Sequence, residues 1–184
     1  MPRLKRSSHL LFWALLQYNF YFLRCGWIFR ITSDFINKNM CGIFGLINFE
    51  PDKGTGIIFR NLFLLSESRG KEASGFALKE DDIFRVHKTP FPASRLVKSK
   101  LYKREIKACL DRKGVPFIGF GHSRLVTNGY EQDDKNNQPV IKHGMIVIHN
   151  GIIVNDESLW AKSNPDNRIS DLDSELIPEL LFNH

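Results

Sequence analysis

The stretch NKNMCGIFGLINFE, residues 37–50, places a Met-Cys-Gly triplet directly before an apolar run. This order is typical of the beginning of a protein, yet residues 1–40 precede Cys41. The run from Cys41 to Phe49 is mostly apolar and predicts a short buried strand. The sequence therefore predicts a domain that begins at Cys41 and occupies residues 41–184, with residues 1–40 as a separate extension.

Charge divides at the same point. Residues 1–40 contain six Lys and Arg and one Asp, whereas residues 41–184 contain 20 Lys and Arg and 19 Asp and Glu. The extension therefore carries a net charge of +5 and the domain only +1. Because the basic excess belongs to the extension, we expect no nucleic-acid binding by the domain.

The extension has three open interpretations. A basic start and an apolar stretch over residues 10–23 are typical of an export signal, although Gln17, Tyr18 and Asn19 interrupt the stretch and no small-x-small cleavage site follows. The stretch is also shorter than the roughly 20 apolar residues that a spanning helix needs. A removable propeptide and a misassigned start codon are the alternatives. We expect a cytoplasmic protein, with membrane attachment only if residues 1–40 are retained.

Residues that bind metals or phosphates show no diagnostic spacing. Cys25, Cys41 and Cys109 form no paired motif, and the six histidines include no i, i+4 pair around a Glu. GxxxxGK[ST], GxGxxG and GxSxG sequences are absent from the chain. We therefore expect neither a metal nor a cofactor.

Apolar periodicity after Cys41 predicts both helices and hairpins. Helices are expected over residues 56–69, ending at Gly70, and over residues 94–113, with Ser94 as N-cap and Gly114 after the end. Strands are expected over residues 41–49, 75–88 with a turn at 80–82, 117–126, and 139–154 with a turn at 143–144. This mixture without strict alternation predicts an α+β fold with antiparallel sheet.

The tail and two loops carry polar clusters. Ser170 and Asp173 have the spacing of a capping box before an apolar run that contains Pro178. Residues 121–129 and 149–151 follow predicted strands, where Asn-Gly pairs also form ordinary turns. Each cluster alone has this local explanation. Together they supply a cysteine, an Arg and Thr on a loop, an Asn-Gly and a late Asp, which are the groups that binding and cleaving an amino-acid amide require.

From Cys41 onward the chain resembles the glutaminase domain of class II glutamine amidotransferases, in the N-terminal nucleophile (Ntn) hydrolase superfamily. The resemblance is closest to glucosamine-6-phosphate synthases, with amidophosphoribosyltransferases as the alternative branch. It covers about 140 residues, and its motifs are CGIFG at 41–45, SRG at 68–70, Ser74-Gly75, GHSRLVTNG at 121–129, HNGII at 149–153 and SDLDSE at 170–175. The resemblance implies a four-layer αββα sandwich of antiparallel sheets.

The resemblance also implies a role for Cys41 that requires a free N-terminus. In this family the cysteine thiol attacks the glutamine side-chain amide, and the α-amine of the same residue handles the proton. An α-amine titrates at about 7.7–8.0 and is therefore a suitable general base, whereas an amide nitrogen is not basic. We therefore expect the mature chain to begin at Cys41.

The remaining site residues follow from the matching motifs. The resemblance implies that Arg124, with Thr127 beside it, binds the glutamine α-carboxylate, because a guanidinium fork fits a carboxylate bidentately. Asp173 is expected to bind the α-ammonium. The Asn150 side chain and the Gly151 N–H are expected to form the oxyanion hole.

Two positions depart from the family pattern. Leu125 stands where the sugar-phosphate synthases carry Trp, and Asn128 stands where they carry His, near the expected carboxylate pocket. Neither change removes a required group, and Asn128 is retained as a substrate-binding candidate. Arg69 and Gly70 are expected to support the nucleophile end of the site.

The predicted function is hydrolysis of free glutamine to glutamate and ammonia, normally to supply amino-sugar phosphate synthesis. Family glutaminase domains continue beyond the position that corresponds to His184, and an acceptor domain follows them. We therefore expect a C-terminally truncated domain whose acceptor domain or subunit lies outside this chain. An inactive truncated or membrane-anchored fragment is the alternative.

Overall fold

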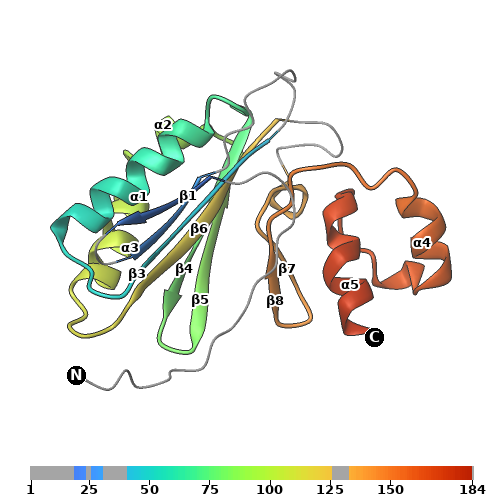
Figure 1. The fold of residues 1–184 in the computed structure, drawn as a ribbon. Coiled ribbons are helices and arrows are strands. Elements are labelled where there is room, and N and C mark those ends of the chain that lie inside the picture. The colour runs from blue at the N-terminus through green and yellow to red at the C-terminus, as the bar shows by residue number, and fades with distance from the viewer. Residues whose placement is uncertain (1–18, 24–25, 31–40, 126–132, 184) are drawn as a thin grey trace.

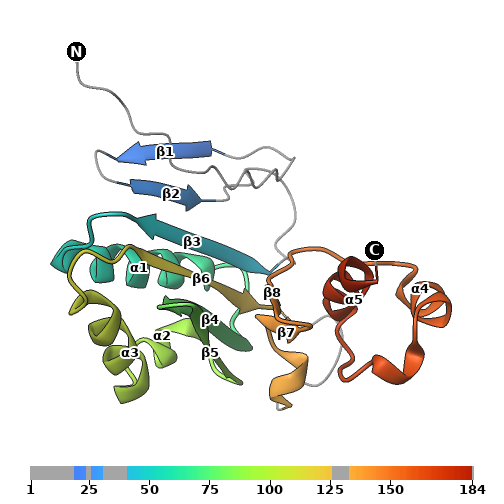
Figure 2. The same cartoon turned by 90° about the horizontal axis from the view of Figure 1, so that it is seen from below.

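The computed structural model describes the backbone of residues 19–23, 26–30, 41–125 and 133–183, with side chains from residue 41 onward. Antiparallel pairing joins six strands into one sheet in the order β1-β2-β3-β6-β4-β5. Their bounds are β1 Asn19–Leu23, β2 Gly26–Arg30, β3 Gly42–Asn48, β4 Ala73–Glu80, β5 Ile83–Thr89 and β6 Phe117–Arg124. Two strands therefore come from the extension, and β2 covers the outer edge of β3 (Figure 2).

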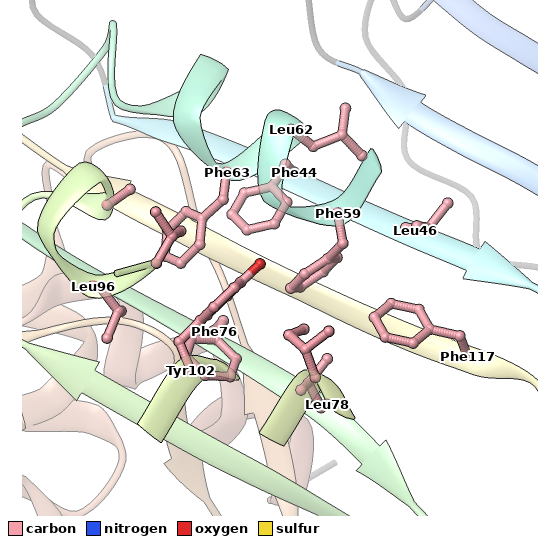
Figure 3. Close-up of a cluster of buried hydrophobic side chains, with 13 residues drawn as sticks. Phe44, Leu46, Phe59, Leu62, Phe63, Phe76, Leu78, Leu96, Tyr102 and Phe117 are labelled. Atoms are coloured by element: carbon pink, nitrogen blue, oxygen red, sulfur yellow. The ribbon is translucent and has the colours of Figure 1, made fainter. Parts of the chain in front are cut away.

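Three helices cover one face of this sheet: α1 (Lys53–Ser66), α2 (Ala93–Leu96) and α3 (Lys100–Leu110) (Figures 1 and 2). Helix α1 begins in a capping box, in which the Asp52 side chain accepts from the Thr55 N–H. The core between helices and sheet is aromatic (Figure 3). Its largest buried side chains include Phe44 of β3, Phe59 and Phe63 of α1, Phe76 of β4 and Tyr102 of α3.

A second, small sheet lies beyond the first and leads to the C-terminal helices (Figure 1). Strands β7 (Val140–Lys142) and β8 (Met145–Val147) pair antiparallel around His143 and Gly144, whose φ angles are 52° and 74°. Positive φ at both central residues is characteristic of a type I′ hairpin turn. The remaining elements are the 3-10 helices η1 (Asp134–Asn136), η2 (Pro165–Asn167) and η3 (Asp173–Glu175), and the α-helices α4 (Asp156–Lys162) and α5 (Leu176–Phe182).

The structure confirms an α+β fold with antiparallel sheets and corrects three local predictions. The helix expected over residues 94–113 is two helices, because Ser99 adopts an extended conformation and its side chain accepts from Tyr102 N. Ser94 is therefore not the N-cap of the long helix. The strand expected over residues 139–154 ends at Val147, where the chain enters a loop.

The third correction concerns the tail. Ser170 and Asp173 do not form a capping box: the Ser170 backbone N–H and hydroxyl both donate to Glu175, at 2.7 and 2.6 Å. Pro178 is compatible with helix α5 because it is the third residue, where a missing N–H breaks no helical hydrogen bond. Among the described residues, no helix is both long and apolar enough to cross a membrane.

Candidate active site

The Cys41 thiol lies at the start of β3, against the peptide group of Leu125 at the end of β6. The Leu125 N–H donates to Sγ at 3.3 Å, and Sγ lies 3.4 Å from the Leu125 carbonyl oxygen, to which the thiol donates. These contacts follow from the β3–β6 register, which pairs Gly42 with Ser123 and continues toward Cys41. The structure thus joins the first motif of the sequence to the 121–129 motif.

Glycine is required where other backbone segments meet this peptide group. A Cβ at Gly70 would lie 2.2 Å from the carbonyl carbon of Arg124 and 2.4 Å from Leu125 N. A Cβ at Gly42 would lie 2.2 Å from the Ser66 carbonyl oxygen at the end of α1. Real side chains do not tolerate such distances, so both glycines allow backbone to pack directly behind the thiol. The supporting role expected for Gly70 stays a prediction.

Burial raises the pKa of the Cys41 thiol above its ordinary value. The Leu125 backbone hydrogen bond and the positive charge of Arg124 act in the opposite direction without overcoming it. The thiol is therefore protonated near neutral pH while Cys41 remains bonded to Met40. Any nucleophilic role for this sulfur requires a base that removes its proton.

Arg124 ends β6 with its side chain buried beneath the segment that precedes β7. Its Nη1 donates to Asn137 Oδ1 at 2.9 Å, and the residue is 3% exposed. The segment itself is held on the sheet at Gly75, where a Cβ would lie 2.2 Å from the Gln138 carbonyl oxygen. Thr127 and Asn128, the neighbouring candidates from the sequence, lie outside the described residues.

Asp173 lies in η3 with both carboxylate oxygens bonded. Oδ2 accepts from the Ile153 N–H at 2.7 Å, and Oδ1 accepts from the Ser174 hydroxyl at 3.1 Å. The residue is 6% exposed. The structure therefore brings Asp173 to the loop that contains Asn150 and Gly151.

Sequence reasoning missed Gln138, which connects these parts. The Gln138 side chain accepts from the His149 N–H at 2.6 Å and donates to the His149 carbonyl at 3.0 Å. Its Nε2 also lies 3.3 Å from the Ser174 hydroxyl, which donates to Asp173. Gln138 thus links the loop before Asn150 to the turn of Asp173. Its position directly after Asn137 carried no motif signal that identified it.

The predicted roles of all these residues stay proposals, and so do those of Asn150, Gly151 and Arg69. Asn150 is partly exposed and Gly151 is exposed, and both lie in the loop after β8. Arg69 lies in the turn after α1, where its N–H donates to the Ser66 carbonyl at 3.0 Å. Within the described part of the chain, no three His, Cys, Asp or Glu side chains converge as a metal site would require.

Comparisons with known proteins extend this picture. A scan against protein-family models gives no match. The chain is similar to a glutamine–fructose-6-phosphate aminotransferase of Clostridium tetani, with 34% identity over 146 residues, 77% of this chain and 22% of that protein. It is also similar to a putative glutamine–fructose-6-phosphate aminotransferase of Saccharomyces cerevisiae, with 31% identity over 155 residues, 77% of this chain and 56% of that protein.

A third relative represents the other branch. An amidophosphoribosyltransferase of Methanocaldococcus jannaschii is 28% identical over 147 residues, 77% of this chain and 29% of that protein. The chain thus spans between 22% and 56% of the length of these three curated relatives. Two of the three are named as aminotransferases that use glutamine, and the third is named as an amidophosphoribosyltransferase. These similarities, each over 77% of the chain, are consistent with a class II glutamine amidotransferase domain.

Proposed function

We propose that the chain is a glutaminase domain that cleaves the side-chain amide of free glutamine with Cys41 as nucleophile. The observation that carries this proposal is the position of the thiol. Cys41 opens β3, bonds to the Leu125 peptide and lies within the influence of the buried Arg124. Gly70 and Gly42 allow backbone to close the site behind it.

The base in this proposal is the α-amine of Cys41 itself. Burial raises the thiol pKa, so the thiol does not ionise readily without help. An α-amine on the same residue has a suitable pKa and needs no further positioning. It exists only after the Met40–Cys41 bond is cut, or when translation begins at Met40 and the initiator is removed. The proposed active form therefore begins at Cys41.

The proposed reaction has two halves. The sulfur forms a bond to the amide carbon while the α-amine takes the thiol proton, and the Asn150 amide and Gly151 N–H stabilise the resulting oxyanion. The proton then passes to the leaving nitrogen, and ammonia departs from a γ-glutamyl thioester. Water, deprotonated by the same amine, attacks the thioester carbon and releases glutamate and the thiol.

Substrate capture is proposed to use the two charged residues on either side of the Gln138 link. Arg124, with Thr127 and Asn128, binds the α-carboxylate, and Asp173 binds the α-ammonium. Each Asp173 oxygen accepts one hydrogen bond from the protein and keeps a second lone pair for an ammonium. Because the two charges recognise a free amino acid, amides within peptides are excluded.

The wider setting is also a proposal. We propose that the domain is part of a four-layer αββα Ntn-hydrolase sandwich whose second sheet begins with β7 and β8. Ammonia is then used by an acceptor domain or subunit outside this chain, as the names of the curated relatives suggest for fructose 6-phosphate.

The test is glutamine turnover by a preparation whose intact mass shows that it begins at Cys41. We expect glutamate and ammonia in equal amounts from this form, none from the same form with Cys41→Ala, and none from protein that retains residues 1–40. Turnover by uncut protein would contradict the proposed base. No turnover by any form would favour the inactive-fragment alternative.

Replacing Arg124 tests the carboxylate role. Arg124→Lys keeps the charge but loses the bidentate fork, so glutamine binding should weaken by about 1–3 kcal/mol, the range for hydrogen bonds to charged groups. Calorimetric titration of glutamine into the Cys41→Ala background measures this change. Unchanged glutamine affinity in Arg124→Lys would mean that residues 121–129 form a turn with no role in binding the α-carboxylate.

A further inference from the structure

A cluster of buried charges joins the β7–β8 hairpin to the C-terminal helices, away from the Cys41 thiol. Lys142 ends β7, Glu175 lies in η3 and Glu179 in α5, and their side chains are 7%, 0% and 0% exposed. Lys142 Nζ lies 2.6 Å from Glu175 Oε1 and 3.2 Å from Glu179 Oε2. We call Lys142, Glu175, Glu179 and His143 the hairpin–helix cluster.

Lys142 is the central cation of this cluster. Buried charges are costly unless each is paired and hydrogen-bonded, and here one ammonium serves two carboxylates. His143 Nε2 lies 2.7 Å from Glu179 Oε2, and Asn167 Nδ2 donates to Glu179 Oε1 at 2.9 Å. Glu179 therefore has other partners, whereas Lys142 is the cation paired with Glu175 among the described residues.

Glu175 in turn holds both sides of the Asp173 turn. It accepts from Ile169 N at 3.0 Å and from the Ser170 N–H and hydroxyl at 2.7 and 2.6 Å, all N-terminal to Asp173. Glu175 itself is the last residue of η3, two positions after Asp173. Glu175 therefore binds the chain on the N-terminal side of Asp173, whose carboxylate accepts from the Ile153 N–H.

We propose that Lys142 is a positioning residue for glutamine capture, acting through Glu175 on the 3-10 turn that carries Asp173. The inference rests on the proposed role of Asp173 as the ammonium-binding residue. Lys142 touches neither substrate nor the reacting atoms. It orients the Asp173 carboxylate indirectly, through its contact with Glu175, which lies 33 positions later in the chain.

The hydrogen bond from Ile153 N to Asp173 supplies a readout that is independent of glutamine. We expect Lys142→Met to speed exchange of the Ile153 amide hydrogen while amides in β3 and β6 stay protected. In the Cys41→Ala background, glutamine Kd should rise by about tenfold, as expected when a charged hydrogen bond is lost. In Lys142→Met protein that begins at Cys41 and keeps this cysteine, the KM for glutamine should rise in parallel while kcat changes little. General destabilisation would not raise KM without also lowering kcat.

Two further variants keep the test decisive. Lys162→Met removes an exposed lysine from α4 and should change neither readout. Glu175→Gln keeps the side-chain shape and leaves Lys142 paired with Glu179, so no charge is left without a partner, and it tests the same link if Lys142→Met does not fold. Unchanged Ile153 exchange and unchanged Kd in Glu175→Gln would overturn the inference.

Asp173→Asn separates the two proposals. If this variant weakens glutamine binding but neither Glu175→Gln nor Lys142→Met does, Lys142 is not a positioning residue and the proposed site stands. If Asp173→Asn leaves glutamine binding unchanged, the ammonium role of Asp173 is wrong. The Ile153 exchange rate then still reports whether Lys142 controls the turn.

Discussion

Gly70 packs closely against the peptide group of Leu125, to which the Cys41 thiol is hydrogen-bonded. Gly70→Ala would place a methyl group 2.2–2.4 Å from Arg124 and Leu125 backbone atoms, which must move. We expect the free energy of unfolding to fall by about 1–3 kcal/mol, the range for overpacking. Urea unfolding measures this loss.

Gly45 in β3 is the matched control. A Cβ there would meet Phe120 Cβ at 3.5 Å and Gly119 O at 3.6 Å, which are ordinary contacts. Gly45→Ala should therefore change the unfolding free energy much less than Gly70→Ala. Equal losses in both variants would mean that the close contact behind the thiol is not decisive.

His122 is a second residue whose burial has a measurable result. Burial, and then the charge of Arg124, lower its pKa to about 3, while the His149 backbone acts weakly in the opposite direction. Neither ring nitrogen has a hydrogen-bond partner among the described residues. An unfolded histidine titrates at about 6.5, so the unfolded chain binds the extra proton first as pH falls below that value.

Stability should therefore decrease from about pH 6.5 toward pH 3, and His87, whose pKa burial also lowers, acts in the same direction. His122→Gln removes the larger contribution and should flatten this part of the curve. Denaturant midpoints at pH 7.5, 6 and 5 test the slope. An unchanged slope in the variant would show that His122 does not stay neutral in the folded protein.

The sequence identified residues whose type alone suggests chemistry, and the structure places Cys41, Arg124 and Asp173 in bonded surroundings. The sequence analysis did not identify Gln138 or Lys142. Their roles depend on partners that lie 11 and 33 positions away, which no local pattern encodes. The roles of Cys41, Arg124 and Asp173, and those of Thr127, Asn128, Asn150 and Gly151, all stay predictions from the motifs.

At the scale of elements, periodicity predicted which segments are helical but not where each begins. The apolar positions of residues 94–113 fit one helix, because Leu96 and Leu101 both face the core. The choice between Ser94 and Ser99 as N-cap depended on tertiary packing: the Ser94 N–H donates to Glu67 beyond α1, whereas the Ser99 side chain accepts from Tyr102 N. The strand expected over residues 139–154 was also too long, because the sequence pattern does not show that β8 ends at Val147.

The two serines give a direct test of this correction. Ser99→Ala removes the cap of α3 and should lower the free energy of unfolding by about 1 kcal/mol. Ser94→Ala should have a smaller effect, because the Ser94 contact with Glu67 uses the backbone. Thermal or urea unfolding of both variants measures the difference. A larger loss in Ser94→Ala would restore the single-helix interpretation.

At the scale of the whole molecule, the chain spans only 22% and 56% of the length of the two aminotransferase relatives. We therefore expect no amino transfer to a sugar phosphate by this chain alone. Supplied with glutamine and fructose 6-phosphate, the form that begins at Cys41 should yield glutamate without amino sugar. Amino sugar from the unaided chain, detected by mass spectrometry, would contradict this expectation.

The pairing of β2 with β3 has a consequence for any chain that begins at Cys41. Such a chain lacks residues 19–30, so the backbone of Phe44–Asn48 loses the partner strand that the register assigns to it. An open row of N–H and C=O groups along a strand is a template for another chain. In the proposed mechanism, the cut that frees the α-amine would therefore also turn β3 from an interior strand into an edge strand, so that activation and a new capacity for association would arise together.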